Sequence, residues 1–431
     1  MSQRYEKRFR KWLQAGVWAS AGLLAGCGGE DSPIQVPADE QNGRSAVTNA
    51  PDALGARYRQ LDESLEISPG SGGGAAAAKA KAQPLLRLIA EVAPPTVDGF
   101  TLQATSTSLK SASTAVVSYN TQGEPYRGGI DLFSSVQGAN KPPELSSSIT
   151  FNDTDVSHVV SIGGVVFAAE AASVDATGFD APGAVERVTR KGKYLTLEGG
   201  QQTPLTSFAA TSLEETASAV YVVTGSTGHV FKLSNPGLVE QARVEVSDAR
   251  WVTEDPDSGN IVVISSNGTG NGGTLTVLDP NLSVLFSHAF SGGDVAESKN
   301  TVEVSGGRAF IAAGPAGVQV LDLVSGNAVF SVAIPSAEDS GVQDPGRRVS
   351  NAVTLDKDLM FISNGEAGVY VVQAPVNFAD ASDAELQESM VLGKLGFDDQ
   401  PPPSVNHVSY RGDKLYVAAG LGGLKIVEVS N

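Results

Sequence analysis

Two of the four histidines, His158 and His407, open strand-like segments in the same way, as Ser157-His158-Val159 and Asn406-His407-Val408. An imidazole near neutral pH can act as a general base or bind a metal ion. Neither histidine has a carboxylate at a fixed spacing that would mark a triad or a metal site. Two interpretations stay open: polar side chains that line an internal channel with water, which we favour, or a chemically active pair at its mouth.

Three asparagines, Asn300, Asn351 and Asn406, begin three related segments, and Ser157 stands at the corresponding place in a fourth. An asparagine side chain can hydrogen-bond to nearby backbone and organise the turn into a strand. This structural role is the favoured interpretation. The alternative is a ring of amides that faces a ligand.

Arg347 and Arg348 form a basic spot in an acidic chain, within a long segment rich in turn residues. Guanidinium groups on a loop can clamp a carboxylate or a phosphate. The favoured interpretation, however, is a solvated loop in which they pair with the nearby Glu338, Asp339 or Asp344. We include both arginines in a candidate ligand-binding face with the histidines and asparagines above.

Asp255 and Asp257 precede a turn glycine, Gly259, as acidic residues do in calcium loops. The distal bidentate Glu of an EF-hand is missing, so a hairpin turn is the favoured interpretation and the two residues are weak calcium candidates. The chain has no P-loop, no His-Glu-x-x-His and no Gly-x-Ser-x-Gly motif. We therefore expect no cofactor, no metal and no catalytic residue.

The single cysteine, Cys27, follows a basic head and a short uncharged stretch that ends in Leu24-Ala25-Gly26. This pattern is typical of a secretory signal. The ending resembles the bacterial lipobox, which implies removal of residues 1–26 and attachment of lipid to Cys27. Several acyl chains would anchor the protein stably to a membrane. Gly28 after the cysteine, in place of Asp, implies the outer membrane, facing either the periplasm or the cell surface.

The formal net charge of −18 excludes a class of partner. A nucleic-acid-binding protein needs a basic face, and this chain is acidic throughout. We therefore expect no nucleic acid as a partner. The expected lipid on Cys27 points instead to the membrane, and its location to an envelope protein or polysaccharide.

The elements that would position these residues are internal repeats. Segments starting at Asn300, Asn351 and Asn406 each contain an alternating strand, a turn, an apolar strand, a Gly-x-x-Gly and another strand. A period of about 50 residues built from short strands predicts a β-propeller, because a small sheet with two apolar faces must stack on others. Extended along the chain, the pattern predicts seven blades with inner strands starting near residues 102, 157, 210, 248, 300, 351 and 406.

The last repeat leaves room for three strands only, and the strand-like segment 85–92 has no other place. We therefore predict that 85–92 completes the seventh blade and closes the ring. The expected fold is all-β, with a propeller over 85–431 that follows the signal peptide (1–26) and a flexible, disordered tether (27–84). Within that tether, residues 52–66 carry apolar side chains at helical spacing and could form a short helix. The favoured interpretation is a solvated, partly helical linker, and the alternative is a helix that docks onto a partner.

Three segments, GVQVLDL, GVYVVQA and GLKIVEV, resemble the LVIVD repeat of bacterial and archaeal surface proteins. The likeness covers residues 300–431 and is weak before them. It implies a propeller at the cell surface, with no catalytic residues to transfer. The closing Asp of the repeat is Asp322 in one copy, and Gln373 and Glu428 in the others.

These features lead to a hypothesis of a lipid-anchored, non-catalytic interaction module. The alternative is a propeller enzyme, a hydrolase or lyase with its site at the channel mouth, because propellers host many functions. A third hypothesis is a calcium-stabilised adhesin.

Overall fold

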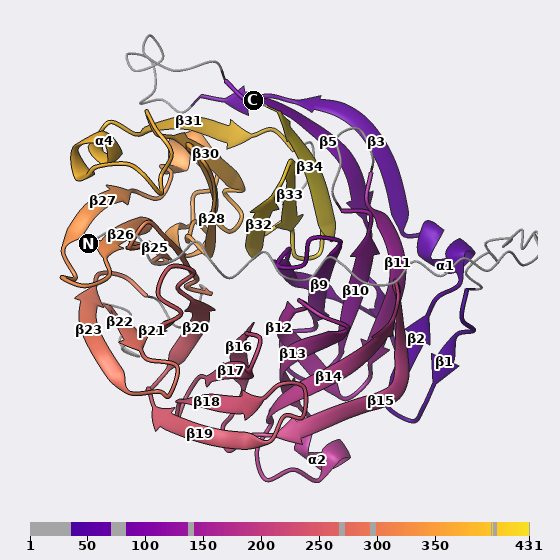
Figure 1. The fold of residues 1–431 in the computed structure, drawn as a ribbon. Coiled ribbons are helices and arrows are strands. Elements are labelled where there is room, and N and C mark those ends of the chain that lie inside the picture. The colour runs from indigo at the N-terminus through magenta and orange to yellow at the C-terminus, as the bar shows by residue number, and fades with distance from the viewer. Residues whose placement is uncertain are drawn as a thin grey trace, which may run out of the picture. The chain divides into compact units, whose positions relative to one another are not determined.

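The computed structural model describes residues 36–69, 83–136, 142–266, 272–293, 299–397, 399 and 403–430. All of them except Val36 belong to one folded unit, Pro37–Asn431. Its strands form seven antiparallel sheets arranged in a ring, a seven-bladed β-propeller, as predicted (Figure 1). The signal peptide, Cys27 and the first part of the predicted tether lie outside the described residues. In the described ranges, no helix is long and apolar enough to cross a membrane.

The first four blades each contain four consecutive strands that run outward from the centre. Blade 1 has β8 (Gln103–Ser108), β9 (Thr114–Asn120), β10 (Gly128–Ser134) and β11 (Glu144–Phe151). Blade 2 has β12 (Thr154–Val160), β13 (Val165–Ala172), β14 (Gly183–Lys191) and β15 (Tyr194–Pro204). Blade 3 has β16 (Ala210–Glu215), β17 (Ala219–Thr224), β18 (His229–Ser234) and β19 (Glu240–Glu245). Blade 4 has β20 (Ala249–Glu254), β21 (Ile261–Ser266), β22 (Gly273–Leu278) and β23 (Val284–Phe290).

The last three blades include the segments that predicted the repeat. Blade 5 has β24 (Val302–Ser305), β25 (Arg308–Ala312), β26 (Val318–Asp322) and β27 (Ala328–Val332). Blade 6 has β28 (Ala352–Asp356), β29 (Leu359–Ser363), β30 (Val369–Gln373) and β31 (Met390–Leu395). Blade 7 has β32 (His407–Arg411), β33 (Lys414–Ala418), β34 (Leu424–Ser430) and β5 (Leu85–Val92). The inner strands β8, β12, β16, β20, β24, β28 and β32 begin within about three residues of the predicted starts, so the predicted boundaries are confirmed.

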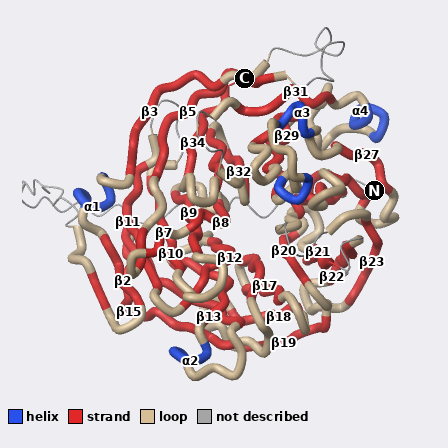
Figure 2. Tube along the Cα trace, turned by 180° about the vertical axis from the view of Figure 1, so that it is seen from behind, coloured by secondary structure: helices blue, strands red, loops and turns tan. Residues whose placement is uncertain are grey.

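Short elements fill the connections between these strands. They are the hairpin β6 (Thr96–Val97) and β7 (Phe100–Thr101), the helices α1 (Pro51–Gly55), α2 (Val174–Thr177), α3 (Ala337–Ser340) and α4 (Asp383–Gln387), and one 3-10 turn (Pro345–Arg347). Figure 2 shows the helices as a few short blue segments among the red strands, with α1, α2 and α4 at the rim, so strands form the body of the ring.

The hydrophobic core is divided among the interfaces between blades. The buried apolar side chains form seven clusters, and each cluster joins two neighbouring blades. Phe310 of blade 5, for example, packs in one cluster with Met360 of blade 6. Each sheet is therefore dry only because a blade lies on either side of it, which is the physical reason for the ring.

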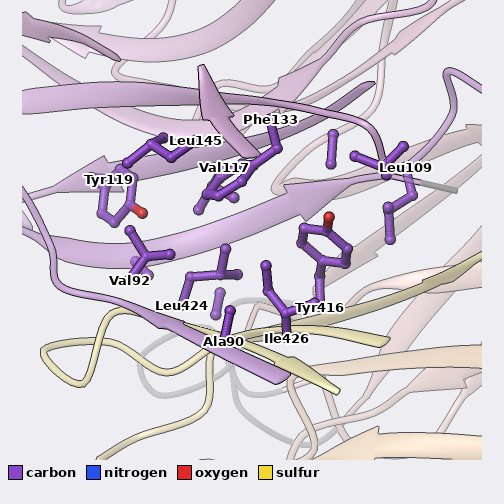
Figure 3. Packing of buried hydrophobic residues seen from close by; sticks show 14 of the residues in the cluster. Ala90, Val92, Leu109, Val117, Tyr119, Phe133, Leu145, Tyr416, Leu424 and Ile426 are labelled. Atoms are coloured by element: carbon purple, nitrogen blue, oxygen red, sulfur yellow. The ribbon is translucent and has the colours of Figure 1, made fainter. Parts of the chain in front are cut away.

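The ring closes through β5, as predicted from the missing strand of the last repeat. This strand pairs antiparallel with β34, from Leu424 opposite Val92 to Ser430 opposite Leu85. Figure 3 shows Ala90 and Val92 of β5 packed with Ile426 of blade 7 and Tyr119 of blade 1. The first and the last of the strands that build the seven blades, β5 and β34, thus belong to one blade.

Paired glycines connect each of the last three blades to its neighbours. In blade 5, Gly314 has a φ of 57° and pairs its backbone with Ser350, at the entry to blade 6. Gly317 has a φ of 79°, and a Cβ there would lie 2.0 Å from the carbonyl oxygen of Val332. The first glycine therefore allows contact between blades, and the second allows a close approach within one.

Residues 36–69 are not a tether, and the helix expected over 52–66 is wrong. Only Pro51–Gly55 is helical, and β3 (Tyr58–Leu65) pairs with β5 along the outer edge of blade 7. A bulge between Gln60 and Glu63 breaks the alternation of β3, so the half-buried positions Tyr58, Leu61 and Leu65 imitate helical spacing. Hydrogen bonding of β3 to the exposed edge of β5 therefore outweighs the helical spacing of its apolar residues.

The N-terminal segment adds a further strand to three adjacent blades. Beside β3, the strand β2 (Ser45–Thr48) pairs with β11 of blade 1 and carries β1 (Glu40–Gln41), and β4 (Ile67–Ser68) pairs with β31 of blade 6. We call residues 40–68 the N-terminal belt. It covers the outer edges of blades 1, 7 and 6, on both sides of the closure.

Two arginines fix the belt by ion pairs. Arg57 donates to both oxygens of Asp131 at 3.0 and 2.6 Å, and Asp131 in blade 1 is fully buried. Arg44 pairs with Asp153 at 3.0 Å and with Glu186 at 2.7 Å, both in or next to blade 2. These contacts join the belt to blades 1 and 2.

We predict that Leu88→Ala lowers the free energy of unfolding by about 2–5 kcal/mol, because Leu88 of β5 is buried in the interface between blades 6 and 7. Leu85→Ala is the matched control, because Leu85 begins the same strand and is 74% exposed. Its effect should stay within about 0.5 kcal/mol. Urea unfolding measures both changes, and equal stabilities of the two variants would contradict the closure.

We predict that Arg57→Met destabilises the protein by about 3–5 kcal/mol, because it leaves the buried carboxylate of Asp131 without its cation. Arg59→Met, two residues away, removes an exposed guanidinium that pairs with Glu91 and should cost less than about 1 kcal/mol. Thermal unfolding of both variants distinguishes a docked belt from a flexible tether, for which both substitutions would be neutral.

Candidate functional site

Hydrogen bonds between neighbouring blades define one equivalent position near the start of the inner strands. At this position Asn351 Nδ2 donates to the carbonyl of Val405 at 3.0 Å, and Asn406 Nδ2 donates to the carbonyl of Ala104 at 2.8 Å. The hydroxyls of Thr105 and Thr211 make the same contact to the next blade. Two of the predicted asparagines thus link blades, and Asn300 at the corresponding place is buried with a φ of 51°.

One residue further along, three aromatic rings from different blades meet in the channel. The ring of Trp251 (blade 4) lies 4.2 Å from that of His158 (blade 2) and 5.1 Å from that of His407 (blade 7), centre to centre. The two imidazoles are 6.4 Å apart, and all three side chains are buried. The structure therefore brings the two predicted histidines together, inside the channel and not at its mouth. We call these three residues the aromatic layer.

Both imidazoles are neutral and accept a backbone hydrogen bond. His158 Nδ1 accepts from the backbone N–H of Leu213 at 3.2 Å, and His407 Nδ1 accepts from that of Thr107 at 3.4 Å. Since a backbone N–H can only donate, this network assigns the proton to Nε2 in each ring. Burial lowers the pKa of His158 well below its usual range and that of His407 to about 3. Neither ring holds a free basic nitrogen positioned as a general base.

A cavity of about 400 Å³ lies on one side of the aromatic layer. Its lining includes the ends of inner strands, with Lys110 and Arg411 among the last residues. It therefore opens on the face where the inner strands end, whereas the asparagines stand where they begin. Four charged groups line it, and they are Lys110, Glu214, Glu303 and Arg411.

Three of the four charged groups make hydrogen bonds or ion pairs that balance them within the protein: Lys110 and Glu214 pair with each other, and Arg411 binds backbone carbonyls. The Lys110 ammonium contacts both carboxylate oxygens of Glu214, and burial raises the pKa of Glu214 in spite of this cation. Arg411 donates to the carbonyls of Leu109, at 2.9 Å, and Lys110.

Glu303 has no such cation. Its carboxyl accepts from the backbone N–H of Leu355 at 3.2 Å and from the hydroxyl of Thr354, and burial raises its pKa to about 7. Before the inner strand of the same blade, Lys299 donates to the carbonyl of Ser157 at 2.8 Å, and burial lowers the pKa of Lys299 to about 7. Both groups therefore titrate near physiological pH.

The remaining candidate residues lie away from this cavity. Arg347 pairs with Glu366 at 3.0 Å and with Asp344 at 3.6 Å, and Arg348 donates to the carbonyl of Pro335 at 2.8 Å. Both belong to the connection from β27 to β28, on the face where inner strands begin. The predicted ligand face is therefore divided between a surface loop, contacts between blades and a buried layer.

The calcium candidates form a turn. Asp255 accepts hydrogen bonds from the backbone of Asp257 and from the Ser258 hydroxyl, within the connection from β20 to β21. Among the residues that the structure describes, no three His, Cys, Asp or Glu side chains converge as metal ligands would.

Sequence reasoning missed Trp251, Glu214 and Glu303. All three occupy channel-facing positions of inner strands, one or three residues after the position that contacts the next blade. An alignment of the seven inner strands at that position would have identified them, but the first four repeats are too degenerate to align by sequence.

Comparisons with known proteins support the architecture. No protein-family model and no curated protein matches the chain. A chain of the mitotic checkpoint complex crystal structure is similar at 11% identity and a TM-score of 0.51, over 79% of this chain and 93% of that one. The WD40 domain of Neurospora crassa Pan2 is similar at 11% identity and a TM-score of 0.49, over 77% and 90% of the two chains. The WD40 β-propeller domain of Doa1 is similar at 12% identity and a TM-score of 0.48, over 78% of this chain and 96% of that one. At such identities the likeness shows the β-propeller fold alone, and the resemblance to LVIVD repeats stays a prediction.

We predict that Glu303→Gln stabilises the protein at pH 8 by about 1–2 kcal/mol. The native carboxyl, with its pKa raised from 4.5 to about 7, holds a proton that the unfolded chain releases, so stability falls as pH rises through this window. The gain from the substitution should shrink as pH falls through 7 and vanish below about 4.5.

Urea unfolding at a series of pH values measures this difference. Glu338→Gln removes an exposed carboxylate from the other face and serves as the control, with no such pH-dependent gain expected. A gain for Glu303→Gln that is the same at pH 4 and pH 8 would contradict the burial of an unpaired carboxyl.

Proposed function

We propose that this protein is a lipid-anchored β-propeller of the bacterial cell envelope that acts as a non-catalytic interaction module. The anchor rests on the basic head, the short apolar stretch and the lipobox-like ending at Cys27. The module rests on the fold, in which a closed ring of blades presents rigidly held loops on two faces. Its partner is an envelope protein or a polysaccharide.

The observation that carries the non-catalytic assignment is the state of the channel histidines. Each Nδ1 is occupied by a backbone N–H, and each Nε2 holds the proton. Within the described residues, no carboxylate is hydrogen-bonded to either imidazole, so the carboxylate-histidine pairing of a hydrolytic triad is missing. Such rings accept hydrogen bonds from the backbone and pack against Trp251.

An enzyme is the second candidate, and one observation favours it. The cavity holds two carboxyl groups in different environments, Glu214 beside a lysine and Glu303 without a cation, and perturbed carboxyl groups in a cavity are typical of acid and base catalysts. The ion pair of Glu214 with Lys110 counts against this assignment, because both groups satisfy each other. A hydrolase or lyase would lose its activity in Glu303→Gln.

We predict that Cys27→Ser moves the protein from the membrane fraction to the soluble fraction and abolishes incorporation of labelled palmitate. Gly28→Asp is the matched control, because it keeps the cysteine and alters the residue that directs sorting. It should retain the lipid label and move from the outer to the inner membrane. Cell fractionation with density-gradient separation of the membranes measures both, and Cys27→Ser that remains in the outer membrane would refute the anchor.

A further inference from the structure

We propose that the channel cavity binds a zwitterionic ligand of the amino-acid type, with its ammonium on Glu303 and its carboxylate toward Arg411. This inference goes beyond the proposed function and does not depend on the lipid anchor. It rests on the charges, the partners and the shape of the cavity.

The position of the ammonium follows from Glu303. A carboxylate can accept about four hydrogen bonds, and the described contacts of Glu303 are one backbone N–H and one hydroxyl. It lines the cavity beside the aromatic layer, where an unpaired charge is costly. Among the described residues, no cation makes an ion pair with Glu303: Lys110 pairs with Glu214 and adds only a longer-range attraction, and Arg411 donates to backbone carbonyls. A ligand ammonium would supply the close cation that Glu303 lacks.

The second charge of the ligand follows from the balance of the cavity. Lys110, Arg411, Glu214 and Glu303 sum to zero when Glu303 is ionised. Once a ligand ammonium ionises Glu303, a simple amine would leave a net positive charge beside Lys110 and Arg411, whereas a simple acid would leave Glu303 protonated and without a cation. Arg411 is exposed at the mouth and uses one of its terminal nitrogens for its carbonyl contacts, so the rest of its planar fork can face a ligand carboxylate. A zwitterionic ligand would place its ammonium on Glu303 and its carboxylate on Arg411.

The walls suit a short aliphatic chain between the two charges. Val302, Val353 and Val408 line the cavity, and the aromatic layer closes one side of it. The imidazoles add no positive charge there, because burial keeps them neutral. A volume of about 400 Å³ lies within the range of small-molecule sites and accommodates a free amino acid or a lysine-like side chain.

Calorimetric titration of the full-length protein with unbranched ω-amino acids, from glycine to 8-aminooctanoate, tests the proposal. We expect saturable binding of at least one chain length below about 10 mM, at least tenfold tighter than the alkylamine and the alkanoate of equal length. Absence of saturation across the series, or equal binding of the singly charged compounds, would overturn the proposal.

Variants locate the site. Glu303→Gln and Arg411→Met should each weaken binding at least tenfold, whereas the control Glu338→Gln should leave it unchanged. Because Arg411 also holds backbone carbonyls, Arg411→Lys is the second variant at that position and should retain part of the affinity. Unchanged binding in Glu303→Gln, with its fold verified by thermal unfolding, would place the ligand elsewhere and refute the inference.

Discussion

The pairing of β5 with β34 is the constraint on which the rest of the structure depends. A blade of four short strands has two apolar faces, so an open row of blades would leave one face bare at each end. Closure through Leu85–Val92 turns those two faces into one more interface, between blades 7 and 1, filled by side chains such as Ala90 and Val92. It also allows residues 249 apart in the chain, His158 and His407, to lie in one layer with Trp251 between them.

The N-terminal belt extends this closure to the outside of the ring. Its strands cover the edges of the three blades at and next to the junction, where the chain ends would otherwise fray. The belt also changes the geometry expected of an anchored protein. The flexible tether expected over residues 27–84 does not extend to Leu85, because β1 already begins at Glu40 and the belt pairs with the outer edges of the blades.

The sequence predicts the elements that a local repeat encodes. Blade number, inner-strand starts and the role of residues 85–92 follow from alternating apolar residues, paired glycines and one missing strand. The belt was not predictable, because the bulge in β3 gives Tyr58, Leu61 and Leu65 a helical spacing and the edge that selects a strand is distant in sequence. The cavity was not predictable either, because Glu214 and Glu303 belong to different blades and only the closed ring places both at one wall.

The channel contains buried titratable groups that lower the stability of the folded protein. Burial disfavours the charged forms of His158, His407, Lys299 and Glu303, and the described contacts of the last three include no ion pair. Each such group lowers the stability of the native state over the pH range in which its unfolded form would be charged. Seven apolar interfaces offset this cost, so the ring tolerates a polar interior whose groups a ligand can complete. Polar groups held rigidly in the channel form a preorganised binding site, because folding has already removed water from them before the ligand binds.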